Sequence, residues 1–305
     1  MTDTGLPPAS SGVRGNQSVV RPDIGQITLS NRLFYGCMIV IGGTYVLLIV
    51  SMLLADAWYV AEKTSAVADK SPTPWRSIVY ENPIAIALAD HKIQYSIWLS
   101  LVSCTLSAVL SVVVAVPIGY LLSRHTFPGK RLLDSVLDIP IVLPPLVVGL
   151  SLLILFQFKP FAFIARDVVY QIPAVVLAQF SVACAFAVRT MKSTFDHINP
   201  RCEQVAIALG CSRLQAFGRV VLPEATAGMT TAFTLAWARS LGEFGPLLIF
   251  AGATRMKTEV LSTTVFLEMN VGNIEGAVAV SMIMVAAAVT VLIITRLYGA
   301  REVGL

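Results

Sequence analysis

Charge is scarce in this sequence. Asp, Glu, Lys and Arg make up 13% of its 305 residues, whereas hydrophobic residues make up 56% and the mean hydropathy is +0.75. A soluble domain carries about 25% charged residues, so this chain cannot cover a water-facing surface with charge. The composition excludes an ordinary soluble protein and indicates a polytopic membrane protein. The net charge of +4 requires no nucleic-acid partner, because the positive-inside bias of membrane proteins accounts for it.

Residues that commonly carry catalysis or bind metals are also scarce. The sequence has three histidines and five cysteines, and the histidines all fall outside the long apolar segments. The cysteine spacings match neither a metal site nor a disulfide framework. A G-x-x-x-x-G-K-[ST] phosphate loop is missing too. These absences disfavour an intramembrane enzyme, and we expect no catalytic residue, metal or cofactor site in the chain.

What the sequence has in abundance is long apolar segments. Six of them approach or exceed the roughly 20 residues that a membrane-crossing helix needs. They cover residues 33–55, 96–122, 135–156, 171–191, 226–250 and 274–295. Because these are continuous apolar runs and not alternating ten-residue segments, a closed β-barrel is excluded. The sequence therefore predicts an all-α membrane protein with six transmembrane helices.

The basic residues predict the orientation. With the N-terminus in the cytoplasm, thirteen Lys and Arg residues fall in internal segments and eight in external ones. The positive-inside rule then places both termini in the cytoplasm. Residues 1–31 are rich in Gly, Pro and Ser and are predicted to be a disordered tail. Residues 32–95 hold the first helix and an external loop, which either contacts a partner or is a solvated connector.

The most informative polar stretch is the internal loop at 192–225, which contains "NPRCEQVAIALGCSRLQAFGRVVLPEA". Asn199 is a good cap for a first short helix, and Gly210 can end that helix in a left-handed conformation. Ser212 and Gln215 form a capping box for a second helix. Apolar side chains on such a pair either seat in a groove on another protein or lie on the membrane surface.

Two ionisable residues interrupt the apolar segment at 226–250. Arg239 and Glu243 are four residues apart, so they face the same side of a helix and can pair. Charge is costly at that depth, which makes both residues functional candidates. Either the pair belongs to a translocation pathway or its gate, or it joins this helix structurally to a neighbour or to a second copy of the chain.

Prolines and glycines predict two breaks within the apolar segments. Gly242, Gly245 and Pro246 predict a bend and a surface that another backbone can approach closely. Pro144 and Pro145 must break or kink the third segment, and the freed backbone either lines a cavity or marks a packing kink. Four threonines could line a polar path or could bond back to their own helix; they are Thr226, Thr230, Thr231 and Thr234.

The internal loop resembles the EAA loop of the membrane subunits of ATP-binding-cassette (ABC) importers. The family pattern is Glu-Ala-Ala, then Gly, then a hydrophobic residue and Leu-Pro. The glycine and the Leu-Pro pair match, whereas the opening triplet reads Gln204-Val205-Ala206 with Glu203 one position early. The resemblance implies that this loop couples to an ATPase subunit. The expected coupling residues are Glu203, Gln204, Ala206, Leu209, Gly210, Phe217, Leu222 and Pro223.

The resemblance extends from about Ser96 to Tyr298. The stretches "SRHTFPGKRLLDSVLDIPIVLPPLVVGLSLLILF" and "ARSLGEFGPLLIFAGATRMKTEVLSTTVFLE" are similar to molybdate, tungstate and sulfate permeases. This implies a type I ABC importer transmembrane domain at 96–298, in the permease subunit of a bacterial inner-membrane importer. The implied substrate is an oxyanion, with molybdate or tungstate ahead of sulfate or thiosulfate.

The resemblance also implies partners. These are two ABC ATPase subunits that bind ATP and Mg, a periplasmic or extracellular substrate-binding protein, and a second permease subunit that we expect to be identical. The chain itself would then be no enzyme and would hold no cofactor. The alternative is a secondary anion transporter driven by an ion gradient, with Glu243 as its proton carrier. Such a carrier would have no need of the glycine-turned helix pair.

Overall fold

The computed structural model describes residues 29–68 and 82–302. The described residues are helical and contain no strand, which confirms the all-α prediction. The chain divides into two units, one up to Leu54 and one from Ala55 onward, and we describe each by itself. The predicted tail at 1–31 lies outside the described residues up to residue 28.

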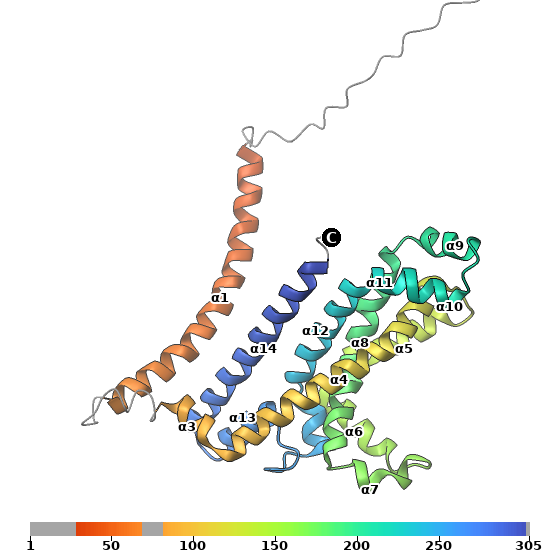
Figure 1. The fold of residues 1–305 in the computed structure, drawn as a ribbon. Helices are drawn as coiled ribbons and strands as arrows, with labels where there is room; N and C mark the ends of the chain where they lie inside the picture. Colours follow the sequence, from red (N-terminus) through yellow and green to blue (C-terminus); the bar gives the residue numbers. More distant parts are fainter. Residues whose placement is uncertain (1–28, 69–81, 303–305) are drawn as a thin grey trace, which may run out of the picture. The chain divides into compact units, whose positions relative to one another are not determined.

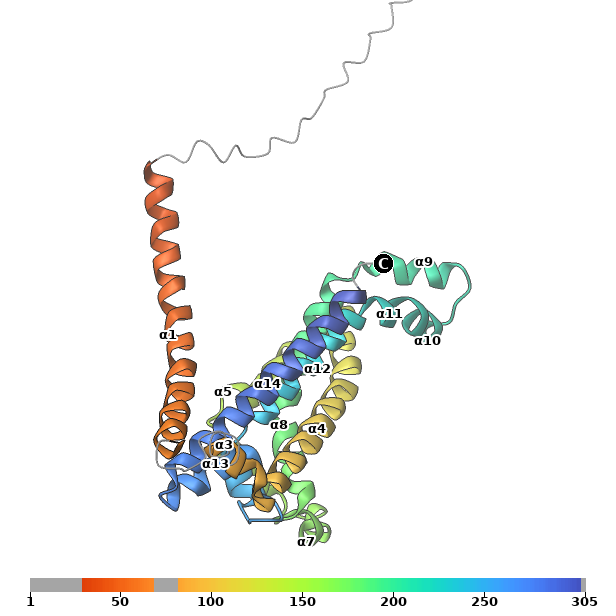
Figure 2. The ribbon, with the colours of Figure 1, turned by 60° about the vertical axis from the view of Figure 1, so that its left-hand side comes forward.

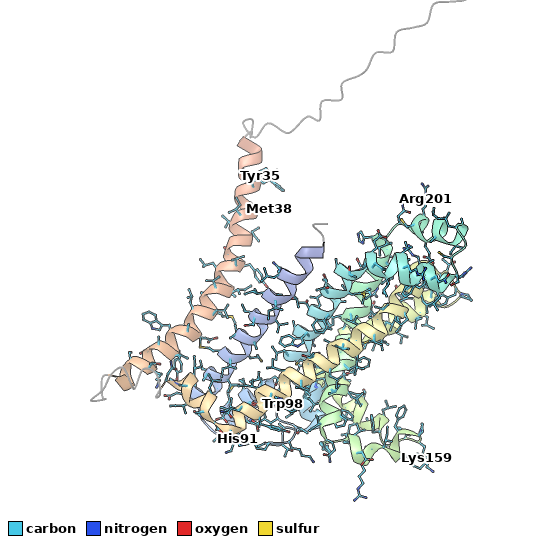
Figure 3. All side chains as sticks on the ribbon, viewed as in Figure 1. Tyr35, Met38, His91, Trp98, Lys159 and Arg201 are labelled. Atoms are coloured by element: carbon cyan, nitrogen blue, oxygen red, sulfur yellow. The ribbon has the colours of Figure 1, made fainter. Side chains whose placement is uncertain are left out.

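Helix α1, Leu29–Ala68, makes up the described part of the first unit and continues past the unit boundary. It has 40 residues and is therefore longer than the predicted span at 33–55. Its apolar side chains between Phe34 and Leu54, including Tyr35 and Met38, are exposed, as Figure 3 illustrates, whereas Val60 is buried. A helix that is apolar all round suits a lipid environment. The predicted external loop thus begins as helix, and its central residues 69–81 lie outside the described part.

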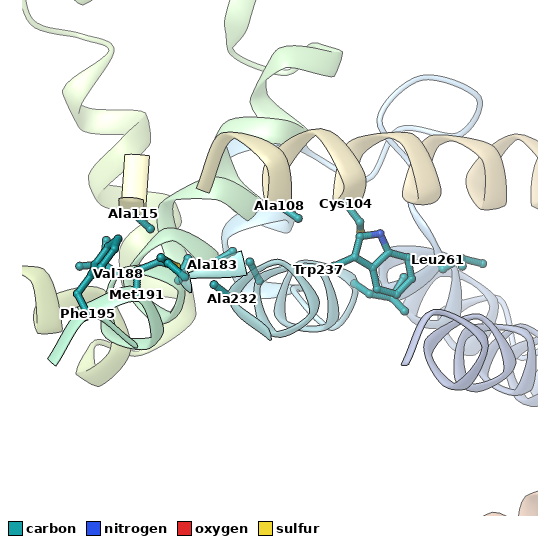
Figure 4. Packing of buried hydrophobic residues seen from close by; sticks show 14 of the residues in the cluster. Cys104, Ala108, Ala115, Ala183, Val188, Met191, Phe195, Ala232, Trp237 and Leu261 are labelled. Atoms are coloured by element: carbon teal, nitrogen blue, oxygen red, sulfur yellow. The ribbon is translucent and has the colours of Figure 1, made fainter. Parts of the chain in front are cut away.

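The second unit is built around α4 (His91–Arg124), α8 (Ile172–His197) and α12 (Thr226–Leu241), which lie side by side (Figures 1 and 2). Their contact surfaces are rich in alanine, which lets helices approach closely in a membrane. Figure 4 shows part of this packing, including Ala108, Ala115, Ala183 and Ala232. The core of this unit therefore consists mainly of small side chains.

The number of continuous spanning helices differs from the prediction. Among the described residues, four helices are long and apolar enough to cross a membrane: α1, α4, α8 and α14 (Ile274–Glu302). A fifth span is present if α5 (Lys130–Val142) and α6 (Pro145–Leu155) count as one, although they are bent by 112°. The predicted segment 226–250 divides into α12 and the π-helix η3 (Leu247–Ala251). Hydropathy detects apolar length, but the proline and glycine breaks redirect the backbone.

The short elements gather at the two ends of the bundle. One end carries α3 (Pro83–Ala89), η1 (Phe161–Phe163), α7 (Ala165–Val168) and α13 (Leu261–Asn270). The other end carries α9 (Pro200–Ala208), α10 (Arg213–Ala216), the π-helix η2 (Phe217–Val221) and α11 (Leu222–Glu224). Figure 3 marks these ends with Lys159 and Arg201. The C-terminal end of α14 lies at the same end as α9 (Figures 1 and 2).

Candidate coupling loop and translocation face

The predicted helix–turn–helix in the internal loop is confirmed. The Asn199 side chain accepts a hydrogen bond from the Arg201 amide at 3.0 Å and caps α9. Gly210 has a φ of +92° and turns the chain between α9 and α10. Ser212 and Gln215 form both bonds of the capping box, at 2.9 and 3.3 Å. The loop therefore has a defined shape that its own side chains fix.

The loop presents apolar side chains to its surroundings. Leu209 and Leu214 are each 81% exposed, and Val205 is exposed as well. Among the other predicted coupling residues, Gln204, Gly210 and Pro223 are exposed, Leu222 and Phe217 are half-buried and Ala206 is buried. Leu214 and Val205 were missing from the predicted set. Their apolar character in a polar loop was the signal that could have identified them.

Glu203 is directed toward α4. The Tyr120 hydroxyl donates a hydrogen bond to Glu203 Oε1 at 2.5 Å, and the Arg124 Nε lies 3.8 Å from Glu203 Oε2. Arg124 also donates from Nη2 to the Ile198 carbonyl at 2.9 Å. Sequence reasoning missed Tyr120 and Arg124. The available signal was their spacing of four residues at the end of an apolar segment, but nothing in the local sequence identified Glu203 as their partner.

Replacing Gly210 with alanine is expected to destabilise the loop by about 1 kcal/mol, because a left-handed conformation is strained for a residue with a Cβ. Nothing lies within 4 Å of the added Cβ, so the effect reports backbone strain alone. Hydrogen exchange of the α9 and α10 amides should become faster. Gly218→Ala is the matched control, since Gly218 also has open space and has no positive φ. Equal exchange in the two variants would contradict the prediction.

The predicted pair is formed between Arg239 in the last turn of α12 and Glu243 just after the helix ends. The Arg239 Nη1 contacts the Glu243 Oε2, with the Glu243 side chain 2% and the Arg239 side chain 31% exposed. Arg239 also lies over the ring of Phe186 from α8, 5.8 Å from its centroid. The Ser262 hydroxyl donates to the Glu243 backbone carbonyl at 2.7 Å. The carboxylate is therefore enclosed by protein, whereas the guanidinium reaches a more open face.

The two predicted breaks lie against each other. A Cβ on Gly245 would be 2.9 Å from the Leu146 nitrogen and from the Pro145 Cβ. A Cβ on Gly149 would be 2.7 Å from the Pro246 Cα. The backbone that approaches the break at 242–246 is therefore that of α6, which begins directly after the break at Pro144. Gly242 caps the end of α12, and Pro144 precedes α6.

The faces of α8 and α12 form a hollow of about 740 Å³ toward the α9 end of the bundle. Its lining includes Arg189, Ser193 and His197 from α8 and Thr231 from α12. The four α12 threonines named above each donate to a carbonyl three or four residues earlier, which confirms their bonding to their own chain. The hollow therefore has charged groups of both signs in its lining, Arg189 from α8 and Glu224 from α11, among apolar surface.

An ion-pair cluster joins α5 to α8 beside this hollow. Arg189 pairs with Asp138 and, at 3.2 Å, with Asp134. Lys192 pairs with Asp134 at 2.8 Å. Two cations and two anions thus balance one another between the helices. The sequence signal was the four-residue spacing of the two aspartates, but nothing in the local sequence identified their partners.

Comparison with known proteins assigns the family. Residues 115–302 match the family described as binding-protein-dependent transport system inner membrane component. The chain is 32% identical over 214 residues to the sulfate transport system permease protein CysT of Salmonella typhimurium, covering 67% of this chain and 77% of that protein. It is 34% identical over 152 residues to the molybdate/tungstate transport system permease protein WtpB of Pyrococcus abyssi, covering 50% and 58%.

A solved structure shares the fold. A bacterial ABC transporter involved in the import of the acidic polysaccharide alginate aligns with a TM-score of 0.61 at 13% identity, covering 88% of this chain and 99% of that one. At that identity the likeness concerns the fold alone. The family match covers more than half of the sequence, and it includes the loop and both breaks. The chain therefore belongs to the family of inner membrane components of binding-protein-dependent transport systems.

Proposed function

We propose that the chain is the permease subunit of an ATP-driven importer of a tetrahedral oxyanion. The observation that carries this proposal is the glycine-turned helix pair at one end of the family fold. It holds Leu209 and Leu214 outward, each 81% exposed. An apolar knob of this kind needs a groove on a partner protein to cover it. The permease domain would be 96–298, with the coupling loop at 192–225.

The proposal includes the partners that the family resemblance implies. Two ATPase subunits, which bind ATP and Mg, would receive the coupling loops in the cytoplasm. A substrate-binding protein would dock on the other face, and a second, identical permease subunit would complete the pathway. Closure of the ATPases on ATP would draw the coupling loops together and convert an inward-facing cavity into an outward-facing one. Both termini would then lie in the cytoplasm, and this chain would catalyse no bond chemistry and hold no cofactor.

The face shared by α8 and α12 is the proposed translocation face. Arg239 reaches it from the middle of its segment, and Arg189 lines the hollow toward the α9 end. Guanidinium groups attract a passing anion, and their carboxylate partners weaken that attraction enough for release. The glycine and proline breaks give the gate its two touching segments, one from α6 and one from 242–246.

The substrate proposal rests on the relatives. The CysT protein is named for sulfate and the WtpB protein for molybdate and tungstate, and both match this chain at similar identity. Sulfate, molybdate and tungstate are all tetrahedral oxyanions. That the substrate is molybdate or tungstate, with sulfate or thiosulfate next, stays a prediction. An ion-gradient-driven carrier is the less favoured function, because it leaves the exposed helix pair without a purpose.

Uptake by the reconstituted complex tests the function. The chain is placed in liposomes with its ATPase and binding protein, and labelled molybdate and sulfate are supplied in turn. ATP-dependent accumulation of one of them, unaffected by a proton uncoupler, is the expected result. Accumulation that needs a proton gradient and continues without ATP would favour the secondary carrier instead.

Replacing Leu209 with aspartate is expected to weaken ATPase binding by about tenfold or more, because buried apolar anchors dominate interface energies. Binding of the purified ATPase to the detergent-solubilised chain measures this effect. The matched control is Val271→Asp, since Val271 is exposed at the other end of the bundle. If both variants bind the ATPase as tightly as the unchanged chain, Leu209 lies outside the interface.

A further inference from the structure

We propose that Tyr120 and Arg124 are positioning residues that fasten the coupling loop to α4 through Glu203, so that movement of the loop moves α4. This inference rests on the proposed function, because it assigns a route by which the ATPase acts on the membrane helices. We call these three residues the α4 latch. Tyr120 and Arg124 lie on the last turns of α4, and Glu203 lies in the first turn of α9.

The contacts of the latch are specific and charge-assisted. Both carboxylate oxygens of Glu203 face α4, one toward the Tyr120 hydroxyl at 2.5 Å and the other toward the Arg124 Nε at 3.8 Å. Arg124 also holds the Ile198 carbonyl, just before α9 begins. Hydrogen bonds to an ionised carboxylate are shorter and stronger than those between neutral groups. The start of α9 is thus held at two points by one helix.

Aromatic packing fixes the Tyr120 ring in place. The ring lies edge-on to Phe217 at 4.8 Å and to Phe195 at 5.6 Å between centroids. Phe195 belongs to α8 and Phe217 to the loop, so three separate elements meet around one ring. Edge-to-face pairs prefer this geometry. The hydroxyl therefore points at Glu203 because its ring cannot turn away freely.

The space around the latch gives it a mechanical role. A cavity of about 600 Å³ opens beside it, between the end of α4 and the loop. The cavity is lined on one side by Leu121 of α4 and by His125, which caps that helix, and on the other by Gln204 and Leu214 of the loop. Apolar packing joins α4 to the loop through Phe217 of η2, whereas the contacts of Glu203 in α9 with α4 are the polar ones to Tyr120 and Arg124. Without them α9 could move on the ATPase while α4 stays behind.

The latch gives a role to Glu203, the residue at which the loop departs from the EAA pattern. Glu203 stands one position earlier than the first residue of the triplet, and its carboxylate is half-buried against its own chain. The ATPase-facing surface consists instead of the exposed side chains around Leu209, Leu214 and Gln204. The carboxylate therefore works inside the permease, and the apolar knob works outside it.

Tyr120→Phe is the sharpest test, because it removes one hydroxyl and leaves the aromatic packing in place. In the reconstituted importer we expect the ATP hydrolysed per anion imported to rise by about twofold or more, as for residues that modulate coupling without touching ligand. Glu203→Gln should act in the same direction, and the double variant should be no worse than the stronger single variant. Tyr45→Phe, an exposed tyrosine on α1, is the matched control.

A second measurement tests the latch without the importer. In the detergent-solubilised chain, amide exchange across α9 should accelerate by about fivefold or more in Tyr120→Phe, since the loss of about 1 kcal/mol shifts an opening equilibrium by that factor. Unchanged α9 exchange would overturn the latch. An unchanged coupling ratio in an importer that does use ATP would also overturn it. If the protein without substitutions imports no oxyanion on ATP, that result counts against the proposed function. Faster α9 exchange in Tyr120→Phe would still support the latch.

Discussion

Replacing Arg239 with methionine is expected to destabilise the fold by about 3 kcal/mol, the lower end of the cost of stripping one partner from a buried ion pair. The reason is that Glu243 is 2% exposed, and Arg239 is its only ion-pair partner among the described residues. Both side-chain oxygens of Glu243 would then be buried without a partner. Denaturant or thermal unfolding in detergent, followed by loss of the monodisperse protein, measures the change.

The double variant Arg239→Met, Glu243→Met separates the two interpretations of the pair. Replacing both ions with apolar side chains of similar volume removes the unpaired charge, so stability should return to near that of the unchanged chain. If the pair is only structural, ATP-dependent uptake should return with it. If the pair belongs to the pathway or gate, uptake should stay lost in a stable protein. A double variant as unstable as Arg239→Met would refute the pairing argument itself.

Gly149→Ala is expected to destabilise the protein by about 1–3 kcal/mol, the usual cost of overpacking a well-packed site. The added Cβ would lie 2.7 Å from the Pro246 Cα, and a backbone atom cannot yield as a flexible side chain can. The contact between α6 and the break at 242–246 would have to open. We therefore expect a clear loss of uptake in a protein that still folds. Thermal unfolding and uptake, measured on the same preparation, test this.

The matched control is Gly43→Ala in α1. Both glycines lie within helices in apolar segments, but a Cβ on Gly43 meets nothing within 4 Å. Alanine also favours a helix over glycine by about 1 kcal/mol, so the control should be neutral or slightly more stable. If Gly149→Ala behaved like Gly43→Ala, the close approach of the two breaks would not constrain the protein.

Local features of this chain could be predicted well from the sequence. The caps at Asn199 and Ser212 and the turn at Gly210 depend on residues within four positions of one another. The break before Pro145 and the one at Gly242 follow from missing donors and from backbone freedom. The pairing of Arg239 with Glu243 could be predicted from their spacing of four residues, although α12 ends at Leu241 and Glu243 lies just beyond it. Each of these needs no knowledge of the rest of the fold.

Partners that are distant in the sequence could not be predicted in this way. Tyr120 meets Glu203 across 83 positions, and Arg189 meets Asp138 across 51. No local pattern connects such residues, because the packing of α4, α5 and α8 decides which side chains meet. The count of six helices is not confirmed exactly, for a related reason. A hydropathy window reports how apolar a segment is, whereas the 112° bend between α5 and α6 depends on backbone direction.

Helix α4 touches both ends of the bundle. Its 34 residues span about 50 Å at 1.5 Å per residue. At the end opposite the α4 latch, the Ser100 hydroxyl accepts the Leu261 amide at 2.7 Å and the Tyr95 hydroxyl donates to the Lys257 carbonyl at 3.1 Å. Linkage between sites is reciprocal. If the coupling loop binds an ATPase as proposed, a protein that docks on residues 252–260 and shifts α4 would change the affinity of the loop for the ATPase, and the ATPase would change that docking affinity by the same factor.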